Sequence, residues 1–466
     1  MKEHVRVVIL AAGLGTRMKS SIAKVLHQAA GDTILNHVLR AALAVAAPEN
    51  ITVVVGHQAE QVRKSVRFTG IQFAEQKEQK GTAHAVVCAR DQAASDEGLL
   101  LILNGDGPLL KAETLKRLLQ SAGDAKTGGT LVTTVVQDAS GYGRIIRSQD
   151  GMIAAIREQK AASPEELQIR EINPGVYCFR AQPFWKYIEE VRPDNPAREY
   201  YLTDMVEILR AHGFAIAPLL VEDETELLGI NTRVELAVAD RILRARKAEE
   251  LMLSGVTIEA PESVRIDAEV EIGPDTVLEP GVQLRGKTRI GERCHVGTGA
   301  ILRDCQIESD VTVYPYVIAE GAVIRSQAAI GPFARVRIRA DIGRDARIGN
   351  FVELKNTDFG AGSKAQHLAY LGDSSIGADA NIGAGTITCN YDGQHKNRTE
   401  IADEVFVGSN STLVAPLKIA EGAYIAAGSV ITKPVEADAL AIGRAYQVDK
   451  PGWARRRREK VSAPAK

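Results

Sequence analysis

Residues 266–302 read IDAEVEIGPDTVLEPGVQLRGKTRIGERCHVGTGAIL, with an aliphatic residue at every sixth position. The rungs of this ladder are Ile266, Ile272, Leu278, Leu284, Ile290, Val296 and Leu302. Neither an α-helix nor an ordinary β-strand has a period of six. Six is the repeat of a parallel β-helix, in which three short strands form one coil and each rung stacks on the coil before it. The stretch therefore predicts a parallel β-helix.

The ladder resumes in two later stretches. Its rungs there are Ile330, Val336, Ile342, Ile348 and Leu354, and then Val407, Leu413, Ile419, Ile425 and Ile431. Glycine follows many of the rungs directly, which suits a coil corner because glycine has no Cβ. The β-helix is expected over about residues 255–435.

The six-residue phase breaks twice. Because the spacing from Leu354 to Ile376 does not fit whole hexads, segment 355–375 is expected to leave the coil in part, as a loop carrying His367. The second break, at 388–404, contains Asn390-Tyr391. Insertions in repeat proteins gather on one face and often carry function. A lone histidine on a loop is more often merely solvated, so the residues alone leave its role open.

Five arginines precede the first break with few acids to balance them. They are Arg335, Arg337, Arg339, Arg344 and Arg347. They form either a solvated face or the place where a sugar phosphate binds.

The first 230 or so residues alternate strand and helix patterns. Apolar runs at 5–10, 51–55 and 99–103 predict buried strands, and 34–45 has helical spacing. This alternation indicates a mostly parallel sheet with ligands at the carboxyl ends of its strands. Residues 232–252, charged and free of glycine and proline, predict a connecting helix.

Gly13-Leu14-Gly15-Thr16-Arg17 directly follows the first strand. It lacks the Gly-Lys-Ser/Thr of a Walker A loop and the third glycine of the dinucleotide fingerprint. Backbone N–H groups at such a turn can still hold phosphates, although a plain tight turn would look the same. Lys24 downstream and Asp106 after the third strand favour a phosphate and metal site.

Composition narrows the function classes. The net charge of −2 and 5% aromatic content argue against a nucleic-acid binder. The five cysteines show no CxxC pairing, which is typical of a reducing cytoplasm without disulfides or zinc sites. Neither a membrane-length apolar run nor a signal-peptide pattern is present, so we expect a cytoplasmic protein without a membrane anchor.

Taken in order, the motifs resemble one family. They are LAAGLGTRM (10–18), Lys24, QKEQKGT (76–82), GYGR (141–144), Glu158, Glu171-Ile172-Asn173 and Gly229-Ile230-Asn231, followed by the β-helix. Together they resemble the bacterial bifunctional N-acetylglucosamine-1-phosphate uridylyltransferases / glucosamine-1-phosphate acetyltransferases over nearly the whole chain. The resemblance implies a Rossmann-like α/β uridylyltransferase domain with a mostly parallel sheet (1–231) and a linker helix (232–254). A left-handed parallel β-helix acetyltransferase domain with a C-terminal tail would follow (255–466).

The resemblance also implies a UTP and UDP-sugar site. Its residues would be Leu10, Ala11, Ala12, Gly13, Lys24, Gln76, Gly81, Thr82, Asn104, Asp106, Gly141, Glu158, Asn173 and Asn231. Gln76, Gly81 and Thr82 would read uracil, Arg17 and Lys24 would act on the phosphates, and Asp106 and Asn231 would hold Mg²⁺. The sugar phosphate would attack the α-phosphorus of UTP in line and expel pyrophosphate.

In the β-helix the same resemblance makes His367 the general base for acetyl transfer, because the usual pKa of histidine, about 6.5, lies near working pH. Glucosamine-1-phosphate would bind Arg337, Lys355, Tyr370 and Asn381. Acetyl-CoA would contact Ala384, Asn390, Tyr391, Ser409, Ala427 and Arg444. The family also implies a homotrimer with the acyl-CoA site between subunits.

Four residues depart from the family pattern. Ala23 and Ile338 each stand where the family has proline, Gly107 stands where valine is common, and Pro174 stands where a small residue is usual. We expect activity to survive, with altered KM.

Two other functions stay open. One is a sugar nucleotidyltransferase with a purely structural or regulatory β-helix, and the other is a non-catalytic binding protein like certain translation-initiation subunits. The Arg455–Arg458 run reads as a solvated, loosely ordered tail, or as a contact to CoA phosphates or a neighbouring subunit.

Overall fold

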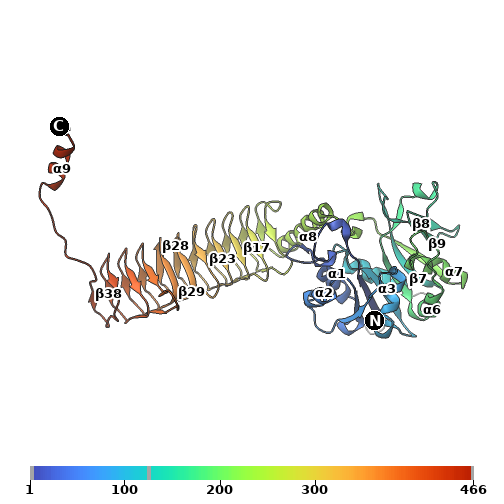
Figure 1. The fold of residues 1–466 in the computed structure, drawn as a ribbon, viewed down its shortest axis with the longest axis horizontal. Coiled ribbons are helices and arrows are strands. Elements are labelled where there is room, and N and C mark those ends of the chain that lie inside the picture. Colours follow the sequence, from blue (N-terminus) through green and yellow to red (C-terminus); the bar gives the residue numbers. More distant parts are fainter. Residues whose placement is uncertain (1–4, 123–126, 463–466) are drawn as a thin grey trace. The chain divides into compact units, whose positions relative to one another are not determined.

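A computed structural model describes residues 5–122 and 127–462. The chain forms two compact units, one ending at Lys247 and the other beginning at Ala248 (Figure 1).

A mixed β-sheet forms the centre of the first unit. Strand β1 (Val5–Ala11) pairs in parallel with β4 (Ile51–Val55) and with β6 (Leu99–Asn104), and β4 pairs in parallel with β5 (Gln72–Glu75). Beyond β6 the sheet continues through antiparallel pairings. Those strands are β11 (Val176–Arg180), β7 (Thr127–Val135), β10 (Glu171–Asn173), β8 (Gly143–Arg147) and β9 (Ile153–Arg157), with β12 (Ala215–Leu220) parallel to β7.

Helices cover both faces of this sheet. Val7 and Ile9 of β1 are buried in one core with α1 (Ile34–Leu43) and α5 (Ala112–Ser121), while Val8 is buried in another core with α3 (Thr82–Cys88) and α6 (Ala181–Tyr187). Successive residues of a strand point to opposite faces, so the apolar runs of the sequence are those of a strand buried on both sides. The carboxyl ends of β1, β4 and β6 meet at one edge, where the expected UTP residues lie.

Helix α8 (Arg233–Leu253) is continuous, as residues 232–252 predicted. Thr232 and Glu235 begin it with reciprocal bonds: the Glu235 N–H donates to Thr232 Oγ1 at 3.2 Å, and the Thr232 N–H donates to Glu235 Oε2 at 2.6 Å. This capping box satisfies backbone N–H groups that the first turn of a helix leaves unpaired.

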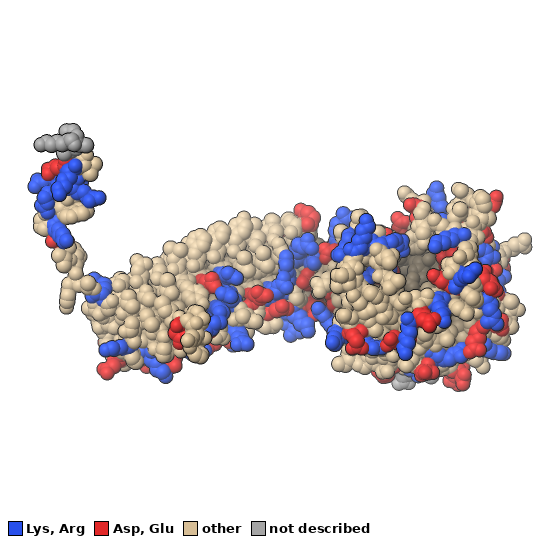
Figure 2. Space-filling model, viewed as in Figure 1, with Lys and Arg blue, Asp and Glu red and all other residues tan. Residues whose placement is uncertain are grey.

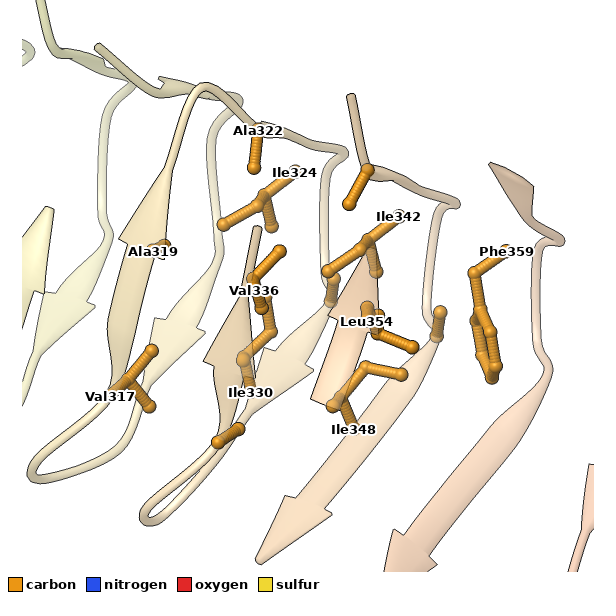
Figure 3. Packing of buried hydrophobic residues seen from close by; sticks show 14 of the residues in the cluster. Val317, Ala319, Ala322, Ile324, Ile330, Val336, Ile342, Ile348, Leu354 and Phe359 are labelled. Atoms are coloured by element: carbon orange, nitrogen blue, oxygen red, sulfur yellow. The ribbon is translucent and has the colours of Figure 1, made fainter. Parts of the chain in front are cut away.

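The second unit is a parallel β-helix, as the period of six predicted (Figure 1). Strands of successive coils pair in parallel, for example β16 (Val277–Leu278) with β19 (His295–Val296). The ladder residues are buried except for Ile272, which is partly buried, and Figure 3 shows Ile330, Val336 and Ile342 among the side chains stacked in the core. Burial of one such aliphatic side chain stabilises the fold by about 1.5–3 kcal/mol, so the rungs together are a main source of the stability of the coils.

The ladder also crosses the stretch between Leu302 and Ile330, where the sequence reading found a gap. Its rungs there are Ile307, Val313, Ala319 and Ile324, all of them buried. Two steps, from Leu302 to Ile307 and from Ala319 to Ile324, are five residues long. A coil corner can therefore lose one residue while the rungs keep their register.

Five-residue steps also explain residues 355–375. The prediction that this segment leaves the coil in part as a loop is wrong. Its residues belong to β29 (Glu353–Phe359), β30 (Lys364–His367) and β31 (Tyr370–Ile376), each paired with neighbouring coils. Two five-residue steps, to Phe359 and to Ile376, account for the lost phase. His367 therefore lies at the end of a strand.

The second break does leave the coil. Between β33 (Ile387–Cys389) and β34 (Thr399–Ile401), residues 390–398 form a segment that an antiparallel bridge from Tyr391 to Lys396 closes. The expected loosely ordered tail contains a helix, α9 (Trp453–Ser462), which carries Arg455–Arg458 with exposed side chains. Residues 463–466, the end of that tail, lie outside the described residues.

Candidate active sites

Two adjoining hollows open where β1 and β6 end. The first is lined by Leu10 to Gly13, Lys24, Gln76, Gly81 and Thr82. The second is lined by Gly141, Glu158, Asn173 and Asn231. Leu10, Thr82, Asn104 and Asp106 line both. All the residues expected to bind the UDP-sugar thus lie around one continuous depression.

A cluster of charged and polar side chains lies where the hollows meet. The Lys24 ammonium forms an ion pair with the Asp106 carboxylate and lies 3.1 Å from Asn231 Oδ1. Arg17 Nη2 donates to the same Asn231 oxygen at 2.8 Å. The side chains of Lys24 and Arg17 and two oxygen groups that could bind a metal, the Asp106 carboxylate and Asn231 Oδ1, therefore meet beside both hollows.

This cluster suits a hard divalent cation such as Mg²⁺. Both protein donors are oxygens, and Mg²⁺ in phosphoryl-transfer sites is typically held by one or two carboxylates together with substrate phosphates and water. Within residues 5–122 and 127–462, no group of three or more His, Cys, Asp or Glu side chains is arranged to hold a metal ion. A site made by Asp106 and Asn231 depends on substrate oxygens to complete it.

Hydrogen bonds that involve the backbone of Asp106 and of Asn231 hold these two residues in place. The Ile230 N–H donates to the Asp106 carbonyl at 2.9 Å. The Asn231 N–H donates to Glu235 Oε2 at 2.6 Å, so the start of α8 fixes Asn231. Sequence reading missed Glu235, whose signal was the capping pattern Thr232-x-x-Glu235.

Two glycines allow close backbone approach in this depression. Gly15 has φ +62°, and a Cβ on it would lie 2.6 Å from Lys24 Cβ. Gly175 has φ +83°, and a Cβ there would lie 2.0 Å from Asn104 Nδ2. Both combine a left-handed backbone with a close neighbour, so only glycine fits without displacing a site residue.

At the end of the first hollow, Gln76 is buried and its Nε2 lies 3.0 Å both from the Gly81 carbonyl and from His84 Nδ1. Gln79 donates to the Ala12 carbonyl at 3.3 Å. These bonds orient amide groups at a place where a planar base would need donors and acceptors.

At the far end of the second hollow, burial raises the pKa of Glu158, which also accepts a bond from Thr203 Oγ1 at 3.4 Å. Asn173 donates to Tyr177 Oη at 2.6 Å and accepts from the Gly175 N–H at 3.1 Å. Sequence reading did not single out Thr203, Tyr177 or Gly175, because tertiary folding alone brings them here.

In the second unit His367 is exposed at the end of β30. Its Nδ1 lies 2.9 Å from Oδ1 of Asn350, its register partner on β28 (Arg347–Asn350). An amide oxygen accepts from a ring N–H, so this contact places the proton on Nδ1 and leaves Nε2 free to accept one. Asn350 is a residue that the sequence reading missed.

Polar residues from the neighbouring strands gather around a second centre. Arg337 Nη1 donates to Glu353 Oε1 at 2.8 Å, and Glu353 is the register partner of Tyr370. Asn390 donates to Tyr370 Oη at 3.5 Å and to the Asp373 carboxylate.

Lysines from two segments also meet here. Lys396, from segment 390–398, lies beside Lys355, and that neighbouring ammonium lowers the pKa of Lys396. Burial raises the pKa of Asp373, but hydrogen bonds from Asn356 and Asn390 and the charge of Lys355 outweigh it and leave this pKa below its usual value.

Polar partners are seen for three of the five arginines that precede the first break, and two of those partners are acids. Arg337 is paired with Glu353, Arg347 lies 3.9 Å from Asp345, and Arg344 donates to Gln327 at 2.9 Å. Glu353 lies on the next coil, whereas Asp345 is only two residues from Arg347 and Gln327 carries no charge, so the acids balance the arginines in part. Of the five, Arg337 reaches the neighbourhood of Tyr370 through Glu353.

Ala384, Ser409 and Ala427 occupy the same corner of successive coils. The Asn410 N–H donates to the Ala384 carbonyl at 2.7 Å, and the Gly428 N–H donates to the Ser409 carbonyl at 2.8 Å. Arg444 Cδ would lie 3.7 Å from a Cβ on Gly428, next to Ala427. Asn381 of β32 (Asn381–Ile382) pairs with Lys364 of the His367 strand.

Comparison with known proteins adds sequence evidence to this geometry. A MobA-like NTP transferase domain matches residues 7–199. Bifunctional protein GlmU of Solibacter usitatus is 53% identical over 459 residues, which cover 98% of each chain. The chain belongs to the GlmU family. GlmU proteins of Koribacter versatilis and Streptococcus agalactiae serotype V are 47% and 43% identical, with 97% of each chain covered.

Membership in the GlmU family confirms the resemblance seen in the motifs. The chain is a bifunctional enzyme, both a nucleotidyltransferase and an acetyltransferase, that makes UDP-N-acetylglucosamine. Both rival functions, a merely structural β-helix and a non-catalytic binding protein, are therefore excluded. No helix in the described part of the chain has the length and apolar character needed to span a bilayer.

Proposed function

We propose that each unit carries one of the two reactions. Residues 255–466 transfer acetyl from acetyl-CoA to glucosamine-1-phosphate, and residues 1–231 transfer uridylyl from UTP to the resulting N-acetylglucosamine-1-phosphate, with 232–254 as the linker helix. The observation that carries the assignment is the meeting of Lys24, Asp106 and Asn231 between two adjoining hollows.

In the first unit, UTP binds the first hollow with uracil against Gln76, Gly81 and Thr82. Its phosphates follow the backbone from Leu10 to Gly13, where N–H groups after a strand face anions. The amino sugar occupies the second hollow against Gly141, Glu158 and Asn173. This places the sugar phosphate in line with the α-phosphorus, and positioning of this kind is the main contribution an enzyme makes to phosphoryl transfer.

Charge neutralisation comes from Arg17, Lys24 and a metal site made by Asp106 and Asn231. When bound, Mg²⁺ neutralises charge on the phosphate oxygens and on the departing pyrophosphate. Lys24 leaves the Asp106 carboxylate and moves its ammonium to the phosphates of UTP, so the ion pair seen without substrate holds the cation close to where it is needed.

In the second unit, His367 Nε2 takes the proton from the glucosamine amine as the nitrogen attacks the thioester carbonyl. Asn350 keeps the ring in the required tautomer. Arg337, Lys355, Tyr370 and Asn381 bind glucosamine-1-phosphate. Acetyl-CoA lies along Ala384, Ser409 and Ala427 with Arg444, and Asn390 and Tyr391 contact the acetyl end.

The acetyltransferase works as a homotrimer in this proposal. Tyr316, Phe333 and Phe351 stack along one corner of successive coils, with ring centroids 5.2 and 5.6 Å apart. These side chains are about half exposed, and Leu368, at the same corner of the next coil, is 63% exposed. Figure 2 shows that much of one face of this unit carries few charged side chains. A second copy that covers this corner lies beside His367, next to Leu368.

Substitution of the aromatic residues at this corner should separate the subunits of the trimer. Phe333→Asp/Phe351→Asp is expected to turn a trimer into a monomer in light scattering and to lower acetyl transfer by about tenfold or more, because buried charge opposes association. Uridylyl transfer should stay unchanged. Lys287→Asp, at an exposed position on another corner, is the control. A variant that stays trimeric would remove this surface from the interface.

The substrates are small, charged metabolites, and we assign the protein to the cytoplasm, where UTP and acetyl-CoA are made. One incubation with glucosamine-1-phosphate, acetyl-CoA, UTP and Mg²⁺ tests the scheme by mass spectrometry. We expect UDP-N-acetylglucosamine in full buffer, and N-acetylglucosamine-1-phosphate alone when EDTA removes the metal. Equal amounts of UDP-N-acetylglucosamine with and without EDTA would refute the metal site.

A further inference from the structure

The segment that precedes Lys24 is held by a side chain from elsewhere in the chain. Gln58 Oε1 accepts from the Ala23 N–H at 2.7 Å, and Gln58 Nε2 donates to the Ser21 carbonyl at 2.6 Å. The two bonds use both ends of one amide, so they fix its orientation as well as its position. Ala23 itself is buried and immediately precedes η3 (Lys24–Leu26).

Gln58 is anchored to the sheet edge that carries the phosphate-binding turn. It begins α2 (Ala59–Ser65) with φ +55°, two residues beyond Gly56. A Cβ on Gly56 would lie 2.9 Å from Ala12, and the His57 N–H donates to the Ala12 carbonyl at 3.5 Å. The amide of Gln58 therefore links the segment 21–23 to Ala12, the residue that follows β1.

We infer that Gln58 is a positioning residue for Lys24 in uridylyl transfer. The inference rests on the proposed role of Lys24 at the phosphates. In the described structure Gln58 is absent from the lining of both hollows, so its effect on the reaction passes through the segment 21–23.

The conformation of Ala23 explains why such a link is needed. Ala23 has φ −57° and ψ 142°, within the range to which proline is restricted, but an alanine is free to leave it. Without the amide bonds the segment gains alternative conformations, and Lys24 spends less time beside the phosphates. Misplacement of a catalytic group by about 1 Å can cost up to about 100-fold in rate.

This reasoning provides a rescue experiment. Gln58→Ala should lower kcat for uridylyl transfer by about tenfold and leave KM for N-acetylglucosamine-1-phosphate within about twofold, because the sugar end of the depression is untouched. Ala23→Pro alone should stay within about twofold of the parent, because the ring fixes φ and the half-exposed Gln58 can turn to solvent. Ala23→Pro/Gln58→Ala should recover most of the lost rate.

Controls separate the outcomes. Acetyl transfer by the same preparations, together with thermal unfolding, reports whether each variant is folded. The positioning role would be overturned if Gln58→Ala left kcat for uridylyl transfer unchanged. It would also be overturned if Ala23→Pro/Gln58→Ala lost as much kcat as Gln58→Ala alone. Lys24→Ala, measured in parallel, tests the proposed function itself. If that variant keeps full uridylyl transfer, the site assignment fails; if it loses activity while the rescue fails, the fault lies with Gln58 alone.

Discussion

Asp106→Ala is expected to lower uridylyl transfer by about 10³-fold or more, because it removes the one carboxylate at the junction of the hollows described above. It also releases Lys24 from its ion pair, so the cation and the metal lose their shared anchor. Mg²⁺-dependent pyrophosphate release from UTP and N-acetylglucosamine-1-phosphate measures the effect.

Two matched variants make this result specific. Asp91→Ala changes an exposed aspartate of the same unit and should keep the parental rate. Asp106→Asn keeps the shape and one oxygen donor but loses the charge, so it should lie near Asp106→Ala if charge on the metal is what counts. Unchanged pyrophosphate release in Asp106→Ala would remove this residue from the metal site.

His367→Ala is expected to lower acetyl transfer by about 10²- to 10⁴-fold, the range that a general base contributes. The attacking amine would have to lose its proton to water. Thiol release from acetyl-CoA with glucosamine-1-phosphate as acceptor gives the rate, and uridylyl transfer should stay at the parental level.

Asn350→Ala tests the orientation of the ring. It leaves the base in place but removes the acceptor at Nδ1, so we expect a smaller loss than for His367→Ala. His295→Ala, on an earlier coil where the ring lies 3.2 Å from Glu279, should have little effect on the rate. Acetyl transfer that survives in His367→Ala would assign the base to another group.

The β-helix could be predicted from the sequence because nearly every rung is a buried aliphatic residue, so the period of the pattern follows burial directly. The fixed period could not show that some coil corners are one residue shorter than others. A coil that loses one residue keeps its core contacts, so Phe359 and Ile376 still stack although the hexad count fails. A strict six-residue repeat does not fit these five-residue spacings, so the sequence predicted a loop here and placed His367 on that loop.

The phosphate turn, Lys24 and Asp106 could be proposed from motifs near the strand ends, since the carboxyl ends of parallel strands meet at one edge. The other residues expected at the first site came from the resemblance to a family. The supporting contacts followed from neither. Gln58, Glu235 and Asn350 act through contacts that the motifs do not reveal, and their residue types are common on any surface. Only the folded chain brings them to Ala23, Asn231 and His367.

The four departures from the family pattern lie in places that tolerate them. Ala23 is held by Gln58, and a Cβ on Gly107 would find its nearest neighbour, the Asn104 carbonyl, at 4.0 Å. The Pro174 carbonyl lies 3.5 Å from Asn104 Nδ2. Ile338 is 58% exposed at a coil corner. None of these residues displaces a proposed ligand.

Mixing the two variants tests most directly whether two separate sites work in series. Asp106→Ala and His367→Ala proteins are each incubated with glucosamine-1-phosphate, acetyl-CoA, UTP and Mg²⁺, and then together. We expect N-acetylglucosamine-1-phosphate from the first, unreacted glucosamine-1-phosphate from the second, and UDP-N-acetylglucosamine from the mixture, because the intermediate is free to diffuse. A mixture that forms no UDP-N-acetylglucosamine, or a single variant that forms it at the parental rate, would contradict the assignment of one reaction to each unit.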